Sequence, residues 1–413
     1  MSTSSVPRPE QGAPSRFPRR LALPRPALTR PALPRAGRDR MAHGAALALA
    51  LFAAVRLAGV LAVIVADHLA GHATTRSLAH AWDSRWYLHI AAHGYGRLIW
   101  ISQAGAVQTD WAFFPLYPGL VRAVTTVLPF VTPGQAALLV SWGAAIVAAY
   151  GVYLIGHHLY GRAVATALVA LWAVLPHAVE LTIAYTESLF AALAAWSLYC
   201  VLRGRWLWAG SLAALAGLAR PTGFAVAVAV GAAAVHEVLR RRGRVPAGLW
   251  VGALLAPVGW LGYVLWVGSQ TGDLLGGYFR VQSAWDSRFD FGVGAARFLA
   301  ALFRHGGGVV YPVALALVVV AVVLFGLLCL DRAPLVLVVF AGVLLLLVLG
   351  GSGSFSSKPR FLLPAFPLLI PPARALVRTW RVRPAQALLV GASLAVVSLL
   401  YGTYVTVVAH SPL

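Results

Sequence analysis

The chain has 413 residues, of which 60% are hydrophobic and 11% are charged, and it carries 33 Lys and Arg against 12 Asp and Glu. This composition excludes a water-soluble globular protein, because runs such as residues 312–330 approach the ~20 apolar residues that cross a bilayer. The basic excess does not indicate nucleic-acid binding, since it lies in an N-terminal tail and in short loops. We therefore expect an all-α integral membrane protein, whose spans satisfy their own backbone hydrogen bonds.

Residues 1–42 are rich in proline, arginine and alanine and show no hydrophobic period. Such a segment is expected to be a disordered basic tail that lies against anionic headgroups at the cytoplasmic face. Met41 is the only other methionine and precedes an apolar run, so translation that began there would leave the tail out. Residues 43–408 are expected to form one polytopic membrane domain.

Eleven apolar segments, separated by proline, glycine and charged residues, are expected to be membrane helices. In chain order they are 43–66, 135–158, 162–177, 186–202, 205–219, 222–239, 246–268, 309–330, 333–350, 361–377 and 385–408. The fifth and sixth of these segments could instead be a broken pair.

The short loops set the expected orientation, because an excess of Lys and Arg marks the cytoplasmic side. Every second loop is basic, including RRRGR at 240–244 and RTWRVR at 378–383, which places the N-terminus in the cytoplasm. Most acidic residues then fall in the outer loops, above all in 67–134 and 269–308. The predicted spans hold almost no ionisable residues at mid-membrane depth, which argues against a transport pathway. We therefore expect the functional site at the extracytoplasmic surface.

The pentapeptide AWDSR occurs twice, at 81–85 and 284–288, and both copies fall in outer loops. Around the first copy, Trp82, Trp86, His89 and His93 share one helical stripe, and Gly94 suits the end of a helix. This pattern predicts an interfacial amphipathic helix in the headgroup layer.

Asp83 is the candidate base of this loop. It lies in the expected first helical turn, where the helix dipole favours an ionised carboxylate that accepts protons. An ion pair with Arg85 or Arg97 is the alternative interpretation. Trp82 and Trp86 could likewise serve as membrane anchors. Further along the chain, Glu187 could be a helix-start acid beside a capping Thr186.

The sequence does not contain a complete metal site. His89 and His93 have a spacing that metal ligands can show, but a third ligand is not evident. A DxD-type nucleotide-sugar motif is also missing. We expect no cofactor, while a divalent ion stays open. Residues 110–120, DWAFFPLYPGL, are expected to be a rigid non-helical turn.

Six segments together resemble the PIG-V-like mannosyltransferases, a branch of the GT-C superfamily of membrane glycosyltransferases, over residues 43 to about 408. In order they are AWDSRWYLHIAAHGYG (81–96), FFPLYP (113–118), AYTESLFAALAAWSLY (184–199), LARPTGF (218–224), VQSAWDSRF (281–289) and KPRFLLPAFPLL (358–369). The resemblance implies a GT-C-type bundle with interfacial helices in the first outer loop. It also implies inverting transfer of a hexose, with mannose as the expected sugar, from a polyprenyl-phosphate donor to an acceptor hydroxyl.

The resemblance implies a carboxylate base in the first outer loop, which Asp83 matches best. Cations at outer span ends are the candidates for the donor phosphate: Arg220, Lys358, Arg360 and Arg288. The candidates for positioning the sugar or acceptor are Trp82, Tyr87, His93, Tyr95, Tyr117, Tyr185, Glu187, Gln282 and Trp285. In the second AWDSR copy, Trp285 and Arg288 are better candidates for contacts than Asp286.

The acceptor does not follow from the resemblance. Arginine is used almost to the exclusion of lysine, and alanine, leucine and valine are abundant, which is typical of a high-GC bacterium and its plasma membrane. The eukaryotic members act on a glycosylphosphatidylinositol precursor, so here the acceptor stays open as a lipid or glycan. A lipid-linked sugar flippase or transporter and a non-catalytic cell-envelope assembly protein are the competing functions.

Overall fold

The computed structural model describes residues 35–102 and 105–409. Most of the expected tail, 1–34, lies outside these residues, and helix α1 (Arg35–Leu69) begins before the predicted boundary at 43. The chain divides into two units, Met1–Arg40 and Met41–Leu413, and the description below concerns the second.

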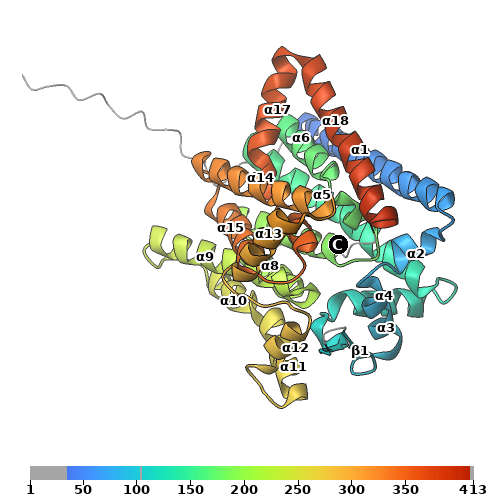
Figure 1. The fold of residues 1–413 in the computed structure, drawn as a ribbon. Helices are drawn as coiled ribbons and strands as arrows, with labels where there is room; N and C mark the ends of the chain where they lie inside the picture. Colours follow the sequence, from blue (N-terminus) through green and yellow to red (C-terminus); the bar gives the residue numbers. More distant parts are fainter. Residues whose placement is uncertain (1–34, 103–104, 410–413) are drawn as a thin grey trace, which may run out of the picture. The chain divides into compact units, whose positions relative to one another are not determined.

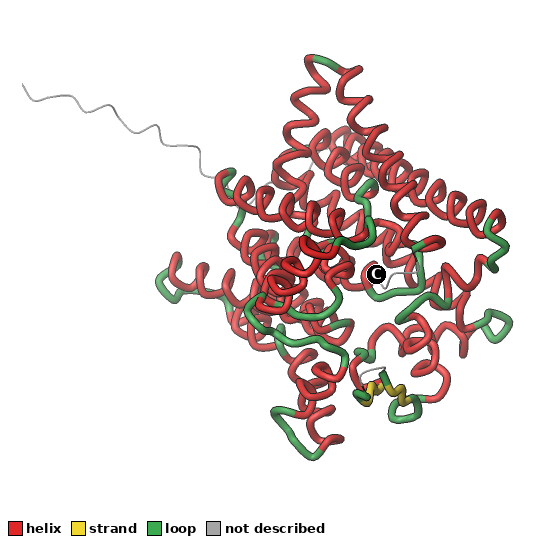
Figure 2. Tube along the Cα trace, viewed as in Figure 1, coloured by secondary structure: helices red, strands yellow, loops and turns green. Residues whose placement is uncertain are grey.

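Helices make up nearly all of this unit (Figure 1). After α1 the helices are α2 (Thr74–Ala79), α3 (Ser84–His93), α4 (Leu116–Val127), α5 (Pro133–Tyr160), α6 (Arg162–Ala173), α7 (Glu187–Leu202), α8 (Trp206–Ala219), α9 (Phe224–Arg240), α10 (Ala247–Leu255), α11 (Val258–Thr271), α12 (Gly277–Ala284), α13 (Val293–His305), α14 (Val310–Leu330), α15 (Leu335–Gly350), α16 (Lys358–Leu362), α17 (Ile370–Val382) and α18 (Pro384–Thr403). Figure 2 shows one small pair of strands among them, β1 (Ile99–Ile101) and β2 (Val107–Thr109), which pair antiparallel.

All eleven predicted segments are helical, but not all are long enough to cross a membrane. Among the described residues, six helices are long and apolar enough to cross a membrane. The pair Phe355–Leu362 and Phe366–Val382, bent by 75°, would make a seventh span. The other four apolar helices, α6, α7, α8 and α15, have 12 to 16 residues. A 12-residue helix is about 18 Å long, shorter than the ~30 Å hydrocarbon core. The chain is therefore a multi-pass membrane protein with six or seven candidate spans, and the expectation of eleven full spans was wrong.

Helix α7 is buried because it packs between α5 and α8 through small side chains. Ala191, Ala194 and Ala195 are fully buried, and a Cβ on Gly151 of α5 would lie 3.0 Å from the Cβ of Ala195. Small residues let helix backbones approach closely in membrane proteins. This packing fixes the position of the N-terminal end of α7, which carries Glu187.

The connection between α6 and α7, residues 174–186, is buried, although the sequence predicted an outer loop there. Its polar backbone groups find partners on α5 and elsewhere: Trp142 Nε1 donates to Thr182 O at 2.8 Å, and Ser141 Oγ donates to Tyr185 O at 3.0 Å. The last carbonyl of α6, Ala173 O, accepts from the guanidinium of Arg56 on α1. Irregular backbone can be buried only when such bonds satisfy it.

The first outer loop contains α2, α3, the strand pair and α4. Helix α3 ends at Gly94, with φ 79°, as the sequence predicted. The turn predicted over residues 110–120 is helical from Leu116 onwards, because Pro118 lies in the first turn of α4, where proline removes no intrahelical bond. Between them, the buried Asp110 carboxylate accepts three backbone N–H bonds, at 3.0 to 3.4 Å, and so closes the base of the strand pair.

Candidate functional site

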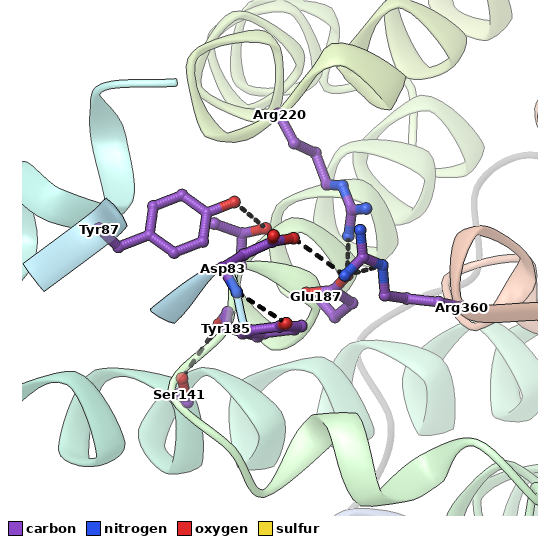
Figure 3. A network of polar contacts seen from close by, with 8 residues as sticks. Asp83, Tyr87, Ser141, Tyr185, Glu187, Arg220 and Arg360 are labelled. Atoms are coloured by element: carbon purple, nitrogen blue, oxygen red, sulfur yellow. Dashed lines mark hydrogen bonds and ion pairs between the residues drawn. The ribbon is translucent and has the colours of Figure 1, made fainter. Parts of the chain in front are cut away.

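Asp83 lies immediately before α3, and its side chain is 27% exposed. Its Oδ2 accepts a bond from Arg360 Nη1 on α16 at 3.0 Å, and its backbone N–H donates to Tyr185 Oη at 3.1 Å (Figure 3). Among the described residues, Oδ1 has no hydrogen-bond partner. The carboxylate is thus held on one side and open on the other, as a group that must accept a proton from a bound molecule would be.

Arg360 joins Asp83 to a second carboxylate. Its Nε lies 3.3 Å from Glu187 Oε1, and Arg220 Nη1 lies 2.7 Å from the same oxygen. Glu187 is 2% exposed and Arg360 is 12% exposed, so water screens these pairs little. Figure 3 shows both guanidiniums directed at Glu187 from different elements. We call Asp83, Glu187, Arg220 and Arg360 the ion cluster; its two positive and two negative charges balance.

Aromatic rings hold the arginines of the ion cluster. Phe361 contacts both, with its ring centroid 5.4 Å from the Arg220 guanidinium carbon and 5.0 Å from that of Arg360. The Tyr185 ring lies 5.3 Å from Arg360. Cation–π contacts of this kind strengthen when the cation is desolvated. Among the described residues, the buried Arg220 Nε has no hydrogen-bond partner, and no hydrogen bond involves the Nη2 atom of either arginine.

The residue before Asp83 has a strained backbone. Trp82 has φ 42°, a conformation that a bulky residue rarely adopts. Such strain costs on the order of 1–3 kcal/mol and persists where the surroundings enforce it. Here the Tyr185 bond to the Asp83 N–H and the bond from Ser84 Oγ to Ala184 O, at 3.0 Å, hold the start of α3 against the buried connection.

Two tyrosines stand behind the ion cluster. Burial, followed by the charge of Asp83, raises the pKa of Tyr185 well above its ordinary value, and the same two causes raise the pKa of Tyr87. Both therefore stay neutral. Tyr87 Oη lies 3.5 Å from Thr186 Oγ1, and Thr186 makes no capping bond at the start of α7. Glu187 does lie in the first turn of α7, as the alternative interpretation held, but the expected side-chain cap by Thr186 is not formed.

Glu180 and His177 lie in the buried connection, close enough to interact electrostatically with the ion cluster. Glu180 is fully buried, and neither of its carboxylate oxygens has a hydrogen-bond partner among the described residues. Burial, then the charge of Glu187, raises the pKa of Glu180 well above its usual range. Burial lowers the pKa of His177 to about 3. Burial therefore favours the neutral form of both groups, which the assignment of these residues to an outer loop did not predict.

Two cations nominated for the donor phosphate lie elsewhere. Lys358 Nζ donates to the carbonyls of Val348 and Gly351, which end helix α15, and so it caps that helix. Arg288 donates its backbone N–H to Ser352 Oγ at 2.8 Å, and its side chain forms no ion pair within the described residues.

The other predicted residues mainly join the outer loops. Gln282 Nε2 donates to Ala112 O at 2.9 Å, and Trp285 Nε1 donates to Thr109 O at 3.3 Å. The Trp285 ring packs edge-on against Trp86 at 4.9 Å, which brings the two AWDSR regions into contact.

Three more of the predicted residues lie beside the cluster rather than in it. Tyr95 donates to Phe113 O at 2.8 Å, and the buried Tyr117 donates to Ala137 O at 2.9 Å. His93 is exposed and lies 3.3 Å from His89 O through Nδ1. In the part of the chain that the structure describes, no three His, Cys, Asp or Glu residues are grouped as metal ligands would be.

No known protein-family profile matches the chain, and no curated protein matches it in sequence. Solved structures of an archaeal oligosaccharyltransferase from Archaeoglobus fulgidus do match its fold. AglB in complex with an inhibitory peptide and a dolichol-phosphate has a TM-score of 0.50 and 14% identity, over 87% of this chain and 56% of that one. The form with Zn and sulfate has a TM-score of 0.49 and 14% identity, over 85% and 53%, and the apo form 0.48 and 15%, over 86% and 56%.

At this identity the likeness concerns the fold alone. The described chain is mostly helical and is similar in fold to AglB, and it spans about half of that protein's length. The expected all-α membrane fold is therefore supported, while the GT-C-type and PIG-V-like assignments stay predictions.

Proposed function

We propose that the protein is a GT-C-type membrane glycosyltransferase of the PIG-V-like kind, which transfers a hexose, most simply mannose, from a polyprenyl-phosphate donor to an acceptor hydroxyl. The observation that carries the proposal is the ion cluster, in which a partly open carboxylate stands beside two buried guanidiniums. Such a reaction needs a base for the acceptor hydroxyl and cations for the departing phosphate. The AglB complex with a dolichol-phosphate supports a lipid-linked donor.

In the proposed reaction Asp83 Oδ1 accepts the proton of the acceptor hydroxyl. The hydroxyl oxygen then forms a bond to the anomeric carbon, on the face opposite the bond from that carbon to the phosphate oxygen, which breaks. The anomeric configuration is inverted, and the polyprenyl phosphate leaves with the bonding electron pair. Asp83 later returns its proton to water.

We assign the leaving phosphate to the Nη2 atoms of Arg220 and Arg360. Guanidiniums bind phosphate through paired, charge-assisted hydrogen bonds, and two of them can follow the charge as it grows during bond cleavage. Glu187 keeps both in position through its ion pairs of 2.7 and 3.3 Å. Lys358 caps α15 and Arg288 forms no ion pair with the cluster, so the proposal does not assign the phosphate to them.

The proposed orientation places the N-terminus in the cytoplasm and the ion cluster at the extracytoplasmic face of a bacterial plasma membrane. Basic loops at the opposite helix ends support it, such as RRRGR at 240–244 after α9 and the loop before α18. The acceptor is a lipid or glycan available on that face.

The decisive experiment is a transfer assay with the purified protein, a radiolabelled polyprenyl-phosphate mannose and a membrane lipid extract. We expect a labelled product with the wild type and none above background with Asp83→Asn, whose thermal unfolding should match the wild type. Product formation would also reject a flippase or a non-catalytic assembly protein. A fully active Asp83→Asn enzyme would refute the assignment of the base.

A further inference from the structure

A groove of about 580 Å³ lies on the membrane helices away from the ion cluster. Helix α7 forms its floor, and α5 and α8 form its walls. Its lining is almost wholly apolar and comprises Leu120, Val140, Ala144, Val147, Leu189, Ala192, Leu193, Trp196, Cys200, Arg205, Trp208 and Leu212. The small side chains Ala144 and Ala192 leave its width open, and Trp196 is fixed by a bond from Nε1 to Val147 O at 3.0 Å.

The groove is separate from the candidate active site. On α7 the cluster residue Glu187 and the first groove residue Leu189 are two positions apart, which is a rotation of about 200° around the helix. The lining residues Leu189, Ala192, Leu193, Trp196 and Cys200 therefore form a stripe on the opposite face of α7. A molecule in this groove does not contact the ion cluster.

The length of the groove fits one acyl chain. Along α7 it extends from Leu189 to Cys200, a distance of about 16 Å at 1.5 Å per residue. The hydrocarbon core is ~30 Å thick, so each leaflet supplies about half of that. A groove of this length fits a single acyl chain whose headgroup lies at one end.

Arg205 marks that end. It precedes α8 in the basic loop at 203–205, is exposed, and its guanidinium has no hydrogen bond or ion pair within the described residues. Trp208, which is 66% exposed, lies on the same wall of the groove. A tryptophan at the interface and an unpaired arginine suit the headgroup region, and a guanidinium binds phosphate through paired hydrogen bonds.

We propose that this groove is a binding site for one acyl chain of an anionic phospholipid from the leaflet on the basic side, with its phosphate held by Arg205. A chain on the floor of the groove would fill the space between α5 and α8 and support the short helix α7 from behind. The inference does not depend on the proposed reaction, because the groove and the ion cluster lie on different faces of α7.

The site can be tested by fluorescence quenching in nanodiscs that contain the full chain. Trp196 is isolated as the difference between the wild type and Trp196→Phe, in phosphatidylcholine with increasing phosphatidylglycerol brominated at the middle of one chain. We expect quenching that saturates at a low fraction of the anionic lipid. Arg205→Gln should raise the fraction needed for half-quenching about tenfold, because it removes a charge-assisted contact.

The matched control is Arg203→Gln, which removes the neighbouring arginine that does not line the groove and should leave the curve unchanged. Ala144→Leu should abolish the saturating component by filling the groove, with thermal unfolding as the check on folding. Brominated phosphatidylcholine should quench only in proportion to its fraction, as random contact does. Equal curves for the two lipids, or an unchanged curve for Arg205→Gln, would overturn the proposal.

Discussion

The two AWDSR segments have the same five residues, but one lies at the start of a helix and the other at the end of one. The first copy, at 81–85, leads into α3, and the second, at 284–288, follows α12 as that helix ends. The strained residue differs as well: Trp82 has φ 42° in the first copy, whereas Asp286 has φ 55° in the second. Aspartate tolerates the left-handed backbone region and tryptophan does not, so only the first copy has a strained residue next to its aspartate.

The surroundings of the two carboxylates differ even more. Asp83 forms an ion pair with Arg360 at 3.0 Å beside the buried Glu187. Around Asp286 the contacts are backbone ones: Ser352 Oγ donates to its carbonyl at 2.6 Å, and its carboxylate has no ion pair in the described ranges. Identical local sequence thus gives a reactive candidate in one place and a loop attachment in the other. The difference comes from the structural elements that pack against each segment.

The largest effect is expected from exchanging each aspartate in turn. Asp83→Asn removes the proposed base and should lower the transfer rate by about 10²–10⁴-fold, the usual contribution of a positioned base. Asp286→Asn should leave the rate unchanged, because asparagine also accepts a positive φ. Both rates are measured with the labelled donor, at equal thermal stability. Similar losses in the two variants would remove the distinction between the copies.

The arginines that accompany each copy provide the next test. Arg360→Gln leaves Asp83 and Glu187 without their shared partner, and breaking a largely buried pair costs about 3 kcal/mol. We expect a clearly lower unfolding temperature and a rise of about 10² in the apparent KM for the donor. Arg288→Gln, the control in the second copy, should change neither quantity. An equal rise in KM for both variants would point to general attraction of the donor instead of a defined phosphate site.

The helices could be predicted from the sequence, whereas the partners within the site could not. All eleven apolar segments are helical because hydrophobic runs report on burial in lipid, and Gly94 ends α3 as its backbone freedom suggests. Among the four short helices, the prediction overestimates the length of α6 most, because residues 174–177 belong to the irregular connection 174–186. That connection is buried only because Ser141 and Trp142 of α5 satisfy its carbonyls, and no local pattern reports this.

Asp83 itself was recognised from the motif, but its partner lies 277 positions along the chain. The sequence suggested the nearer Arg85 or Arg97, and the structure pairs Asp83 with Arg360 instead. Charge at a span end could nominate cations, yet it could not separate Arg220, which reaches Glu187, from Lys358, which caps α15. The direction of a long side chain depends on packing between distant helices.

A smaller effect should come from the aromatic contacts that join Trp285 of the second copy to the first outer loop. Trp285 packs against Trp86 and Phe113, with ring centroids 4.9 and 5.2 Å apart. Trp285→Ala should cost about 1 kcal/mol from these pairs and loosen α12 from the first loop, which we expect as a lower unfolding temperature and a several-fold higher donor KM. Phe291→Ala is the control, since that ring is 87% exposed. If Trp285→Ala unfolded like this control, the contact would not couple the two regions.

The smallest effects are expected for Glu180, near the first copy, and for Asp290, just after the second. Glu180 has a raised pKa in the folded protein, so it keeps its proton at pH values where the unfolded chain has lost it. Its contribution to stability is fully present below the ordinary value of 4.5 and falls as pH rises above it. Glu180→Gln, a neutral side chain of the same shape, should therefore unfold at a higher temperature than the wild type at pH 8, and this advantage should shrink towards pH 4.5.

Asp290, behind the second copy, provides the contrast for Glu180. It accepts the backbone N–H groups of Gly292 and Gly294 at 3.0 and 2.8 Å, at the start of α13. Asp290→Asn should lower stability by about 0.5–1 kcal/mol, because an amide is a weaker cap than a carboxylate. The same neutralising change thus stabilises one region and weakens the other. If the unfolding temperature of Glu180→Gln tracked the wild type across pH 4.5 to 8, Glu180 would be ionised, and a third negative charge would lie near the ion cluster.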